Sequence, residues 1–333
     1  MTGSSFHLPA DTGRTASTGL AALINPLSFR MSLRERAERC AKLVLAHGGE
    51  VFRVHDLAQI ERALAQSHAW GIRHLVIAGG DGTLQGAVSW LARHVPPVSM
   101  PSLVLLSAGR TNYVAEDIGT RSHFLETLET VLTRKPEQLH PVDRPTLKLE
   151  HPSIGQLHGF FLAGAMLDEV IRYVHRFQNR RTSWLHRLHV ASIAGVASLA
   201  LHWALGRYRF SLPRLDIEVK GLGRDQAACR FLLMTTLEHE HSLIDPYARR
   251  GDGPLRVTSI SRDAKQLTWR LSKLARGRFS TEMNYKTGYI SGRCNNIIIQ
   301  NLSSFVLDGQ EFELDPREPL RVSAGPVFRF LRP

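Results

Sequence analysis

The sequence predicts an α/β domain with a mostly parallel sheet, followed by a β-rich antiparallel domain. Strand and helix patterns alternate up to residue 144, and such alternation is typical of a parallel sheet covered by helices on both faces. From residue 145 onward, short strand patterns are separated by turns. The 333 residues suffice for two hydrophobic cores, so we expect domains at 19–144 and 145–333. The polar residues 1–18 are expected to form a disordered leader.

The first domain is expected to contain four strands with helices between them. A capping-box pattern, Ser32 to Glu35, predicts the start of the first helix, which the glycine pair 48–49 ends. Asp56 is expected to cap the second helix, which runs towards Trp70. The buried apolar runs predict strands at 19–25, 50–55, 74–78 and 102–106.

A glycine-rich turn after the third strand is the most specific feature of the chain. It comprises Gly79, Gly80, Asp81, Gly82 and Thr83, and a helical pattern follows it directly. Glycines in this position let backbone N–H groups approach a phosphate at a helix N-terminus, and the carboxylate can hold Mg²⁺ or a nucleotide hydroxyl. The turn lacks the lysine of the Walker motif and the spacing of the dinucleotide motif. A simple tight turn is the alternative, although two glycines usually suffice for one.

Ligands of such sheets bind beyond the carboxyl ends of the strands. Three loops are expected to meet there, at 25–29, 79–83 and 107–112. Gly109 allows close backbone approach in the third loop, and the Asn112 amide can both donate and accept hydrogen bonds. Turn and helix-cap chemistry is the alternative interpretation of both residues.

The second domain is expected to consist mainly of short strands. One long helical segment, around 188–205, interrupts them. The strand patterns lie at 146–151, 160–163, 215–219, 229–235, 255–259 and 296–300.

Charge is distributed unevenly along the chain, whose net charge of +12 favours anionic partners. Residues 170–215 contain eight arginines and no acid, with tryptophans and leucines interleaved, and residues 262–278 contain a single acid, Asp263. This mixture favours an anionic membrane surface over a merely solvated basic face. We expect no nucleic-acid partner, because no recognition module is present.

Cysteine usage and hydropathy indicate the compartment. The three cysteines lie far apart, which favours a reducing environment over a disulfide framework or a zinc site. No secretory signal is evident, and the apolar stretch 190–205 is too short for a membrane span. We therefore expect a cytoplasmic protein that associates peripherally with a membrane. The two histidines in residues 238–241 supply at most half of a zinc shell, which favours a polar strand end or loop.

Several motifs, in order, resemble those of the diacylglycerol kinase catalytic-domain family of bacterial lipid kinases, which is related to sphingosine kinases and NAD kinases. Besides the glycine turn, the matching segments are 25–28 (Asn-Pro-Leu-Ser), 105–115, 252–255 (Asp-Gly-Pro-Leu) and 307–309 (Leu-Asp-Gly). The resemblance implies a kinase that uses ATP and Mg²⁺ to phosphorylate a lipid hydroxyl in a cleft between the domains. In that family the final residues can return to the first domain. A homodimer is a further possibility for this chain. The implied nucleotide-binding residues are Asn25, Pro26, Gly79, Gly80, Asp81, Gly82, Thr83, Gly109 and Asn112, with Asp81 as the metal ligand.

The chain departs from the family pattern on the acceptor side of the reaction. Gln310 stands where the family carries the glutamate that is its proposed general base, and a neutral amide cannot take a proton. Glu311 and Asp308 are the candidate replacements, and we name them with Asp81 as candidate catalytic residues. Three further departures are Phe29 for a glycine, Tyr113 for an aspartate and Arg256 for an aspartate.

These departures leave alternative functions open. A catalytically impaired protein that binds lipid or senses nucleotide on the same scaffold is the first alternative. A soluble kinase of the NAD kinase type is less favoured, because the Asn-Glu pair that such enzymes place after the glycine turn is missing.

Overall fold

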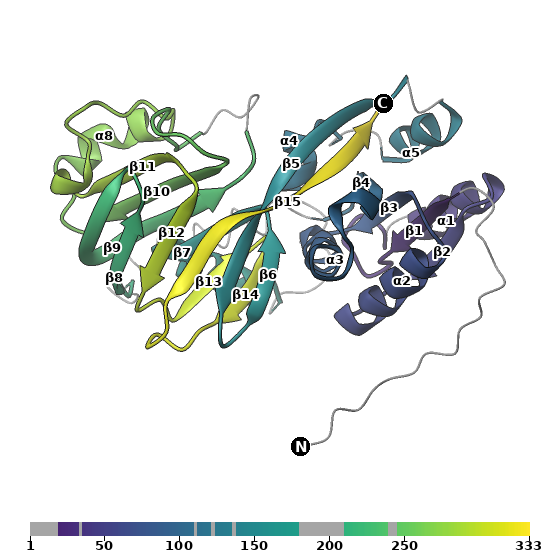
Figure 1. The fold of residues 1–333 in the computed structure, drawn as a ribbon, viewed down its shortest axis with the longest axis horizontal. Helices are drawn as coiled ribbons and strands as arrows, with labels where there is room; N and C mark the ends of the chain where they lie inside the picture. The colour runs from purple at the N-terminus through teal and green to yellow at the C-terminus, as the bar shows by residue number, and fades with distance from the viewer. Residues whose placement is uncertain are drawn as a thin grey trace, which may run out of the picture.

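The chain forms two bodies that are joined by long strands (Figure 1). The computed structural model describes residues 19–32, 35–109, 112–120, 124–134, 138–179, 210–238 and 245–333, with the side chains of 174–179 excepted. The expected leader 1–18 lies outside these residues, as do the whole expected helical segment 188–205 and the rest of residues 180–209. The predicted fold class is confirmed, because a parallel α/β body precedes an antiparallel β-rich one.

The first body is a parallel sheet in the order β4-β3-β1-β2. Its strands are β1 Leu20–Ile24, β2 Glu50–Arg53, β3 His74–Gly79 and β4 Ser102–Ser107. Its helices are α1 Arg36–Ala46, α2 Leu57–Ala69, α3 Asp81–His94, α4 Tyr113–Asp117 and α5 Phe124–Thr133, with a 3₁₀ turn at Pro97–Ser99. All four strands expected from the sequence are therefore present.

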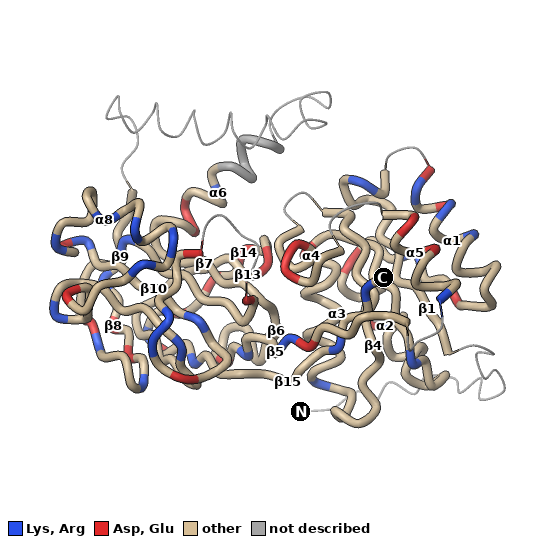
Figure 2. The backbone as a smooth tube through the Cα atoms, turned by 90° about the horizontal axis from the view of Figure 1, so that it is seen from above, with Lys and Arg blue, Asp and Glu red and all other residues tan. Residues whose placement is uncertain are grey.

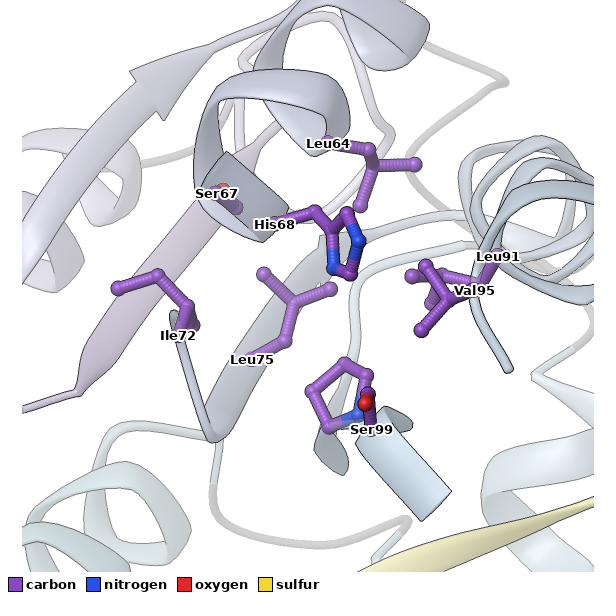
Figure 3. Close-up of a pocket in the computed structure, with 9 residues that line it drawn as sticks. Leu64, Ser67, His68, Ile72, Leu75, Leu91, Val95 and Ser99 are labelled. Carbon is purple, nitrogen blue, oxygen red and sulfur yellow. The ribbon is translucent and has the colours of Figure 1, made fainter. Parts of the chain in front are cut away.

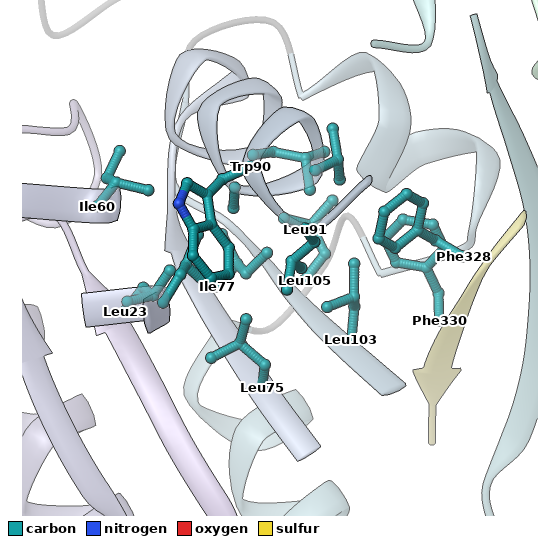
Figure 4. Packing of buried hydrophobic residues seen from close by; sticks show 14 of the residues in the cluster. Leu23, Ile60, Leu75, Ile77, Trp90, Leu91, Leu103, Leu105, Phe328 and Phe330 are labelled. Atoms are coloured by element: carbon teal, nitrogen blue, oxygen red, sulfur yellow. The ribbon is translucent and has the colours of Figure 1, made fainter. Parts of the chain in front are cut away.

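Alternate residues of the strands face the two sides of this sheet. Leu23 and Ile77 pack with Trp90 of α3 on one side (Figure 4). Ile24 packs with Val44 of α1 on the other side. The sheet is covered on both faces because its strands are apolar at nearly every position.

The helix starts of the first body match the sequence expectation in one case and not in another. The Asp56 side chain accepts a hydrogen bond from the Gln59 N–H at 2.8 Å and caps α2 as expected. The capping box expected for α1 is wrong, because that helix begins only at Arg36, after Glu35 with a positive φ of 55°. The Ser32 hydroxyl donates instead to the Phe29 carbonyl at 3.1 Å, which closes a local turn.

The second body is built from antiparallel strands. They are β5 His140–His151, β6 Gly155–Gly159, β7 Phe161–Ala165, β8 Arg214–Val219, β9 Gly223–Thr235, β10 Leu255–Ser261, β11 Tyr289–Cys294, β12 Asn296–Gln300, β13 Ser304–Leu307, β14 Gln310–Glu313 and β15 Leu320–Arg332. Its helices are α6 Met166–Asn179 and α8 Leu267–Leu274, with a 3₁₀ turn at Tyr285–Thr287. The expected strands correspond to β5, β7, β8, β9, β10 and β12.

Strand β15 belongs to both bodies. It pairs antiparallel with β5 along nearly its whole length and with β12 over its first residues, and Phe330 lies beside Leu103 of β4 in parallel pairing. Phe328 and Phe330 are fully buried in the core of the first body (Figure 4). The end of the chain thus completes the parallel sheet that its beginning starts.

A small hollow lies at the amino ends of β3 and β4, lined by Leu64, His68, Leu75 and Val95 (Figure 3). It has room for about one water molecule, far less than a nucleotide needs. It also lies at the opposite end of the strands from the glycine turn. None of the helices in the described part of the chain combines the length and hydropathy needed to cross a bilayer.

Candidate active site

The glycine turn joins β3 directly to α3. Gly79 is the last residue of the strand, Gly80 caps the helix in an extended conformation, and α3 begins at Asp81. The Thr83 and Leu84 N–H groups donate to the Gly80 carbonyl at 3.0 and 3.1 Å. The first N–H groups of a helix lack intrahelical partners and carry its positive dipole end. This edge of the sheet therefore presents an anion-binding helix terminus.

The loop after β1 braces the turn. The Asn25 side-chain amide donates to the Thr83 hydroxyl at 3.1 Å, and its carbonyl oxygen accepts from the Leu27 N–H at 3.0 Å, across Pro26. The Ser28 hydroxyl accepts from the Gly80 N–H at 3.1 Å. Asn25 thus fixes the shape of the turn through direct hydrogen bonds.

The loop after β4 closes against the same turn. A Cβ at Gly109 would lie 3.0 Å from the Gly80 Cα, a tight contact that shows how closely the two loops approach. The Asn112 side chain donates to the Gly109 carbonyl at 2.9 Å, and Asn112 itself has a left-handed φ of 50°. The three loops expected from the sequence therefore meet at one place.

Asp81 lies in the first turn of α3, partly buried. Burial raises the pKa of its carboxyl from 3.8 to about 6, and a hydrogen bond from the Asn112 backbone N–H opposes this rise. The carboxyl is consequently ionised at neutral pH. Its negative charge is further favoured by the helix N-terminus.

Asp308 approaches from the second body, at the tip of the β13–β14 hairpin. Asp308 and Gly309 both have positive φ, 47° and 80°, as a two-residue Asp-Gly turn requires. The buried carboxyl accepts hydrogen bonds from the Phe160 and Phe161 N–H groups, each at 2.9 Å. Burial raises its pKa to about 8, the Phe160 N–H opposes the rise, and the charge of Asp81 adds to it. The two carboxyl groups are therefore electrostatic neighbours.

Gln310, the first residue of β14, lies against the glycine turn at 79–83. A Cβ at Gly82 would fall 2.4 Å from the Gln310 Nε2, so the amide rests against the first turn of α3. Glu311, the next residue of β14, points the other way and pairs with Arg172 at 3.2 Å. The structure thus brings together Asp81, Asp308 and Gln310, and it places Glu311 on the opposite face of the hairpin.

Residues 19–143 match the family model of the diacylglycerol kinase catalytic domain. The predicted family resemblance is confirmed. Three solved structures from Bacillus anthracis str. Sterne are similar, all described as diacylglycerol kinases, two of them provisionally. The first is 14% identical with a TM-score of 0.63, and the match covers 98% of this chain and 99% of that one. The second is 12% identical with a TM-score of 0.59, covering 94% and 96%.

The third of these structures is 14% identical with a TM-score of 0.58, covering 93% of this chain and 95% of that one. A comparison with curated proteins gives no match. At these identities the structural likeness shows the fold, and it extends over both bodies. The matched family model is that of a kinase domain, which implies the use of a nucleotide.

Arg256, a departure from the diacylglycerol kinase pattern, forms a buried ion pair. Its guanidinium binds both carboxylate oxygens of Asp245 at 2.6 and 2.7 Å and donates to the Leu237 carbonyl at 3.1 Å. It also lies 4.8 Å from the ring centroid of Tyr247. Because a cation already neutralises this carboxylate, the arrangement disfavours a second metal ion at this position.

Tyr113, a second departure, fills the junction between the bodies. Its ring meets Phe161 edge-on at 4.8 Å. Burial raises the pKa of its hydroxyl, which the nearby Arg256 charge opposes. Phe29, the third departure, is half-buried in the loop after β1. In the 238–241 segment, only Glu238 is described, and it pairs with Arg293.

Arg172 holds the β13–β14 hairpin in place, a role that the sequence does not indicate. It donates to Asp168 at 2.7 Å, to Glu311 at 3.2 Å and to the Phe312 carbonyl at 2.9 Å. These bonds tie α6 to β14. The guanidinium of this arginine is therefore committed to contacts within the fold, and the expected membrane surface at residues 170–215 stays a prediction.

The carboxyl groups at this site suit a magnesium ion that binds together with a nucleotide. Within the described residues, no cluster of three or more His, Cys, Asp or Glu side chains is positioned to hold a metal. Mg²⁺ is usually bound through one or two carboxylates together with substrate phosphates. Asp81, with the Asp308 carboxyl as its electrostatic neighbour, suits that mode of binding.

Proposed function

We propose that this protein is an ATP- and Mg²⁺-dependent kinase that phosphorylates the hydroxyl of a diacylglycerol-like or sphingoid lipid at a membrane surface. The observation that carries the proposal is the meeting of the α3 N-terminus and Asp81 with the Gln310 hairpin of the second body. A donor site and an acceptor site are thereby joined across the two bodies. The family match supports the kinase reaction.

The chain's own residues provide a cradle for the phosphates. The N-terminus of α3 offers backbone N–H groups, and the Gly109 loop packs closely beside Gly80 at the same place. Asp81, ionised at neutral pH, is the residue that would hold Mg²⁺. When bound, the ion would neutralise charge on the transferring phosphoryl group.

Gln310 acts by positioning the lipid hydroxyl. Its amide can hydrogen-bond that hydroxyl but cannot accept its proton. Of the two candidate substitutes, Asp308 is committed to the Phe160 and Phe161 N–H groups, and Glu311 is committed to Arg172. Phosphoryl transfer depends mainly on positioning and charge stabilisation, so no dedicated base is needed at Gln310. As the bond from the lipid oxygen to phosphorus forms and the bond to ADP breaks, the hydroxyl proton passes to an oxygen of the transferred phosphoryl group or to water.

Purified protein with Mg·ATP and a panel of lipids in mixed micelles tests the proposal. We expect a phosphorylated lipid product from the wild type and none from Asp81→Ala. Including NAD as an acceptor separates the lipid kinase from the NAD kinase alternative. Absence of product from every lipid, with ATP binding retained, would refute the proposed reaction.

A second candidate function is a lipid-binding or nucleotide-sensing protein without turnover, and the amide at Gln310 favours it. Gln310→Glu distinguishes the two. If the wild type is inactive and this variant gains activity, the native protein is a sensor on the kinase scaffold. Efficient turnover by the wild type would eliminate this candidate.

A further inference from the structure

The outward face of α8 carries a tryptophan that the fold leaves uncovered. Trp269 is 86% exposed, whereas Leu271, 49% exposed, lies about 160° around the helix from it and nearer the inward side. The inward face is anchored by Leu274, which packs with Met283 and Tyr289. Since a helix turns by about 100° per residue, Trp269 lies about 140° from Leu274 and points away from the protein.

Cations surround this apolar face. Residues 262–286 contain seven Lys and Arg residues and two acids, a net charge of +5. Glu282, one of the acids, is already paired with Arg270 at 3.0 Å, and Arg270 lies over the Tyr289 ring. The exposed cations are Arg262, Lys265, Lys273, Arg276, Arg278 and Lys286.

We propose that α8 and the adjoining residues up to 286, here called the α8 surface, dock the protein on an anionic membrane. An exposed tryptophan beside lysines is the composition of a membrane-interface anchor, because the ring enters the headgroup region while the ammonium groups meet anionic lipid. Lys273 follows Trp269 by four residues and lies on the same side of the helix. Tyr285, 43% exposed, adds a second amphipathic aromatic side chain to this surface.

The position of α8 suits this role. It lies at the end of the second body that is remote from the first body (Figure 1). In Figure 2 the start of α6 and α8 both lie on the upper side of the second body, and Lys and Arg positions accompany α8. Docking at the α8 surface therefore brings to the membrane the body that carries the Gln310 hairpin.

Membrane docking through the α8 surface rests on the proposed lipid kinase function, and it is tested separately from that function. Binding to vesicles is measured without ATP or turnover, so a failure of docking and a failure of catalysis are distinguishable. The partner chemistry is an anionic phospholipid bilayer, for which the net positive charge of the surface is complementary.

Vesicle sedimentation of the full chain is the direct test. We expect binding to phosphatidylcholine vesicles that contain phosphatidylglycerol and much weaker binding to pure phosphatidylcholine. Removing one cation, as in Lys273→Ala, should weaken binding about fivefold, the effect of a single cation near anionic headgroups. Trp269→Ala should weaken binding by at least as much, and the wild-type blue shift in tryptophan emission should disappear in Trp269→Phe.

Two exposed residues elsewhere provide matched controls. Val98, 95% exposed in the first body, and Lys220, exposed between β8 and β9, should each be replaceable by alanine without loss of binding. Equal vesicle binding by the wild type, Trp269→Ala and Lys273→Ala would overturn the proposal. The proposal would also be overturned if these variants kept vesicle binding but lost self-association. That result would identify α8 as an interface between copies of the chain.

Discussion

Replacing Gly82 with alanine is expected to impair phosphoryl transfer while leaving the fold intact. Gly82 lies in the first turn of α3 and is not among the residues with positive φ, so its backbone accepts alanine. Alanine is favoured over glycine in a helix by about 0.5–1 kcal/mol. The thermal midpoint of the variant should therefore equal or exceed that of the wild type.

The catalytic cost follows from the position of Gln310. The new Cβ would lie 2.4 Å from the Gln310 Nε2 and 3.2 Å from its Cδ. Ordinary van der Waals contact begins at about 3.4 Å, so the Gln310 amide must move by about 1 Å. This movement costs little free energy because the Gln310 side chain is exposed. A misplacement of about 1 Å in a positioning group can cost about 100-fold in rate, or about 2.7 kcal/mol of transition-state stabilisation.

The assay is the initial rate of lipid phosphorylation in mixed micelles, with the ATP dissociation constant and thermal midpoint measured on the same samples. We expect a reduced kcat with ATP affinity retained. The control is the double-mutant cycle with Gln310→Ala, in which Gly82→Ala should have little further effect. A wild-type kcat in Gly82→Ala, or the same rate loss in both backgrounds, would refute the reasoning.

Three further results are expected. Activity should fall as the pH drops below about 6, since the raised pKa of Asp81 leaves its carboxyl protonated there; a kcat/KM profile flat down to pH 5 would contradict this. The pKa of Asp308 is raised to about 8 in the folded protein, so unfolding between about pH 4 and 8 releases its proton. The free energy of unfolding of the wild type, relative to Asp308→Asn, should therefore decrease over this range. Urea titrations should show a decrease of at most about 1.4 kcal/mol per pH unit. Arg256→Met should destabilise the fold by up to about 3 kcal/mol, because it leaves the partly buried Asp245 without its cation. Arg224→Met, at an exposed ion pair, should barely move the denaturation midpoint, and equal shifts would count against the Arg256–Asp245 pair.

The first body could be predicted well from the sequence because its signals are local. Apolar runs of strand length and glycine punctuation mark β1 to β4, and the Asp56 cap is a contact over three residues. The start of α1 was missed because Ser32 satisfies its hydroxyl at the Phe29 carbonyl and the chain makes a left-handed step at Glu35 before the helix begins. Such competition between caps and turns is invisible in the pattern alone.

The second body was harder because its pairings join distant residues. The Asp308-Gly309 dipeptide carries the signal of a two-residue hairpin turn, which would have revealed β13 and β14. Strand alternation accounts for Gln310 and Glu311 facing opposite ways. The approach of Asp308 to Asp81, and the pairing of Arg256 with Asp245, depend on docking of separate strands, for which linear spacing carries no signal.

Strand β15 has a consequence for how the protein is made. A ribosome synthesises β1 to β4 before the strand that lies on the open edge of their sheet, since β15 emerges only after β5 to β14. Until then, the space for Phe328 and Phe330 in the first core stays unfilled, and the edge of β4 has no partner. The nascent first body therefore remains incomplete, with an open strand edge, until β15 has emerged. Deleting the part of β15 that carries Phe328 and Phe330 should therefore destabilise the first body, which is synthesised before it.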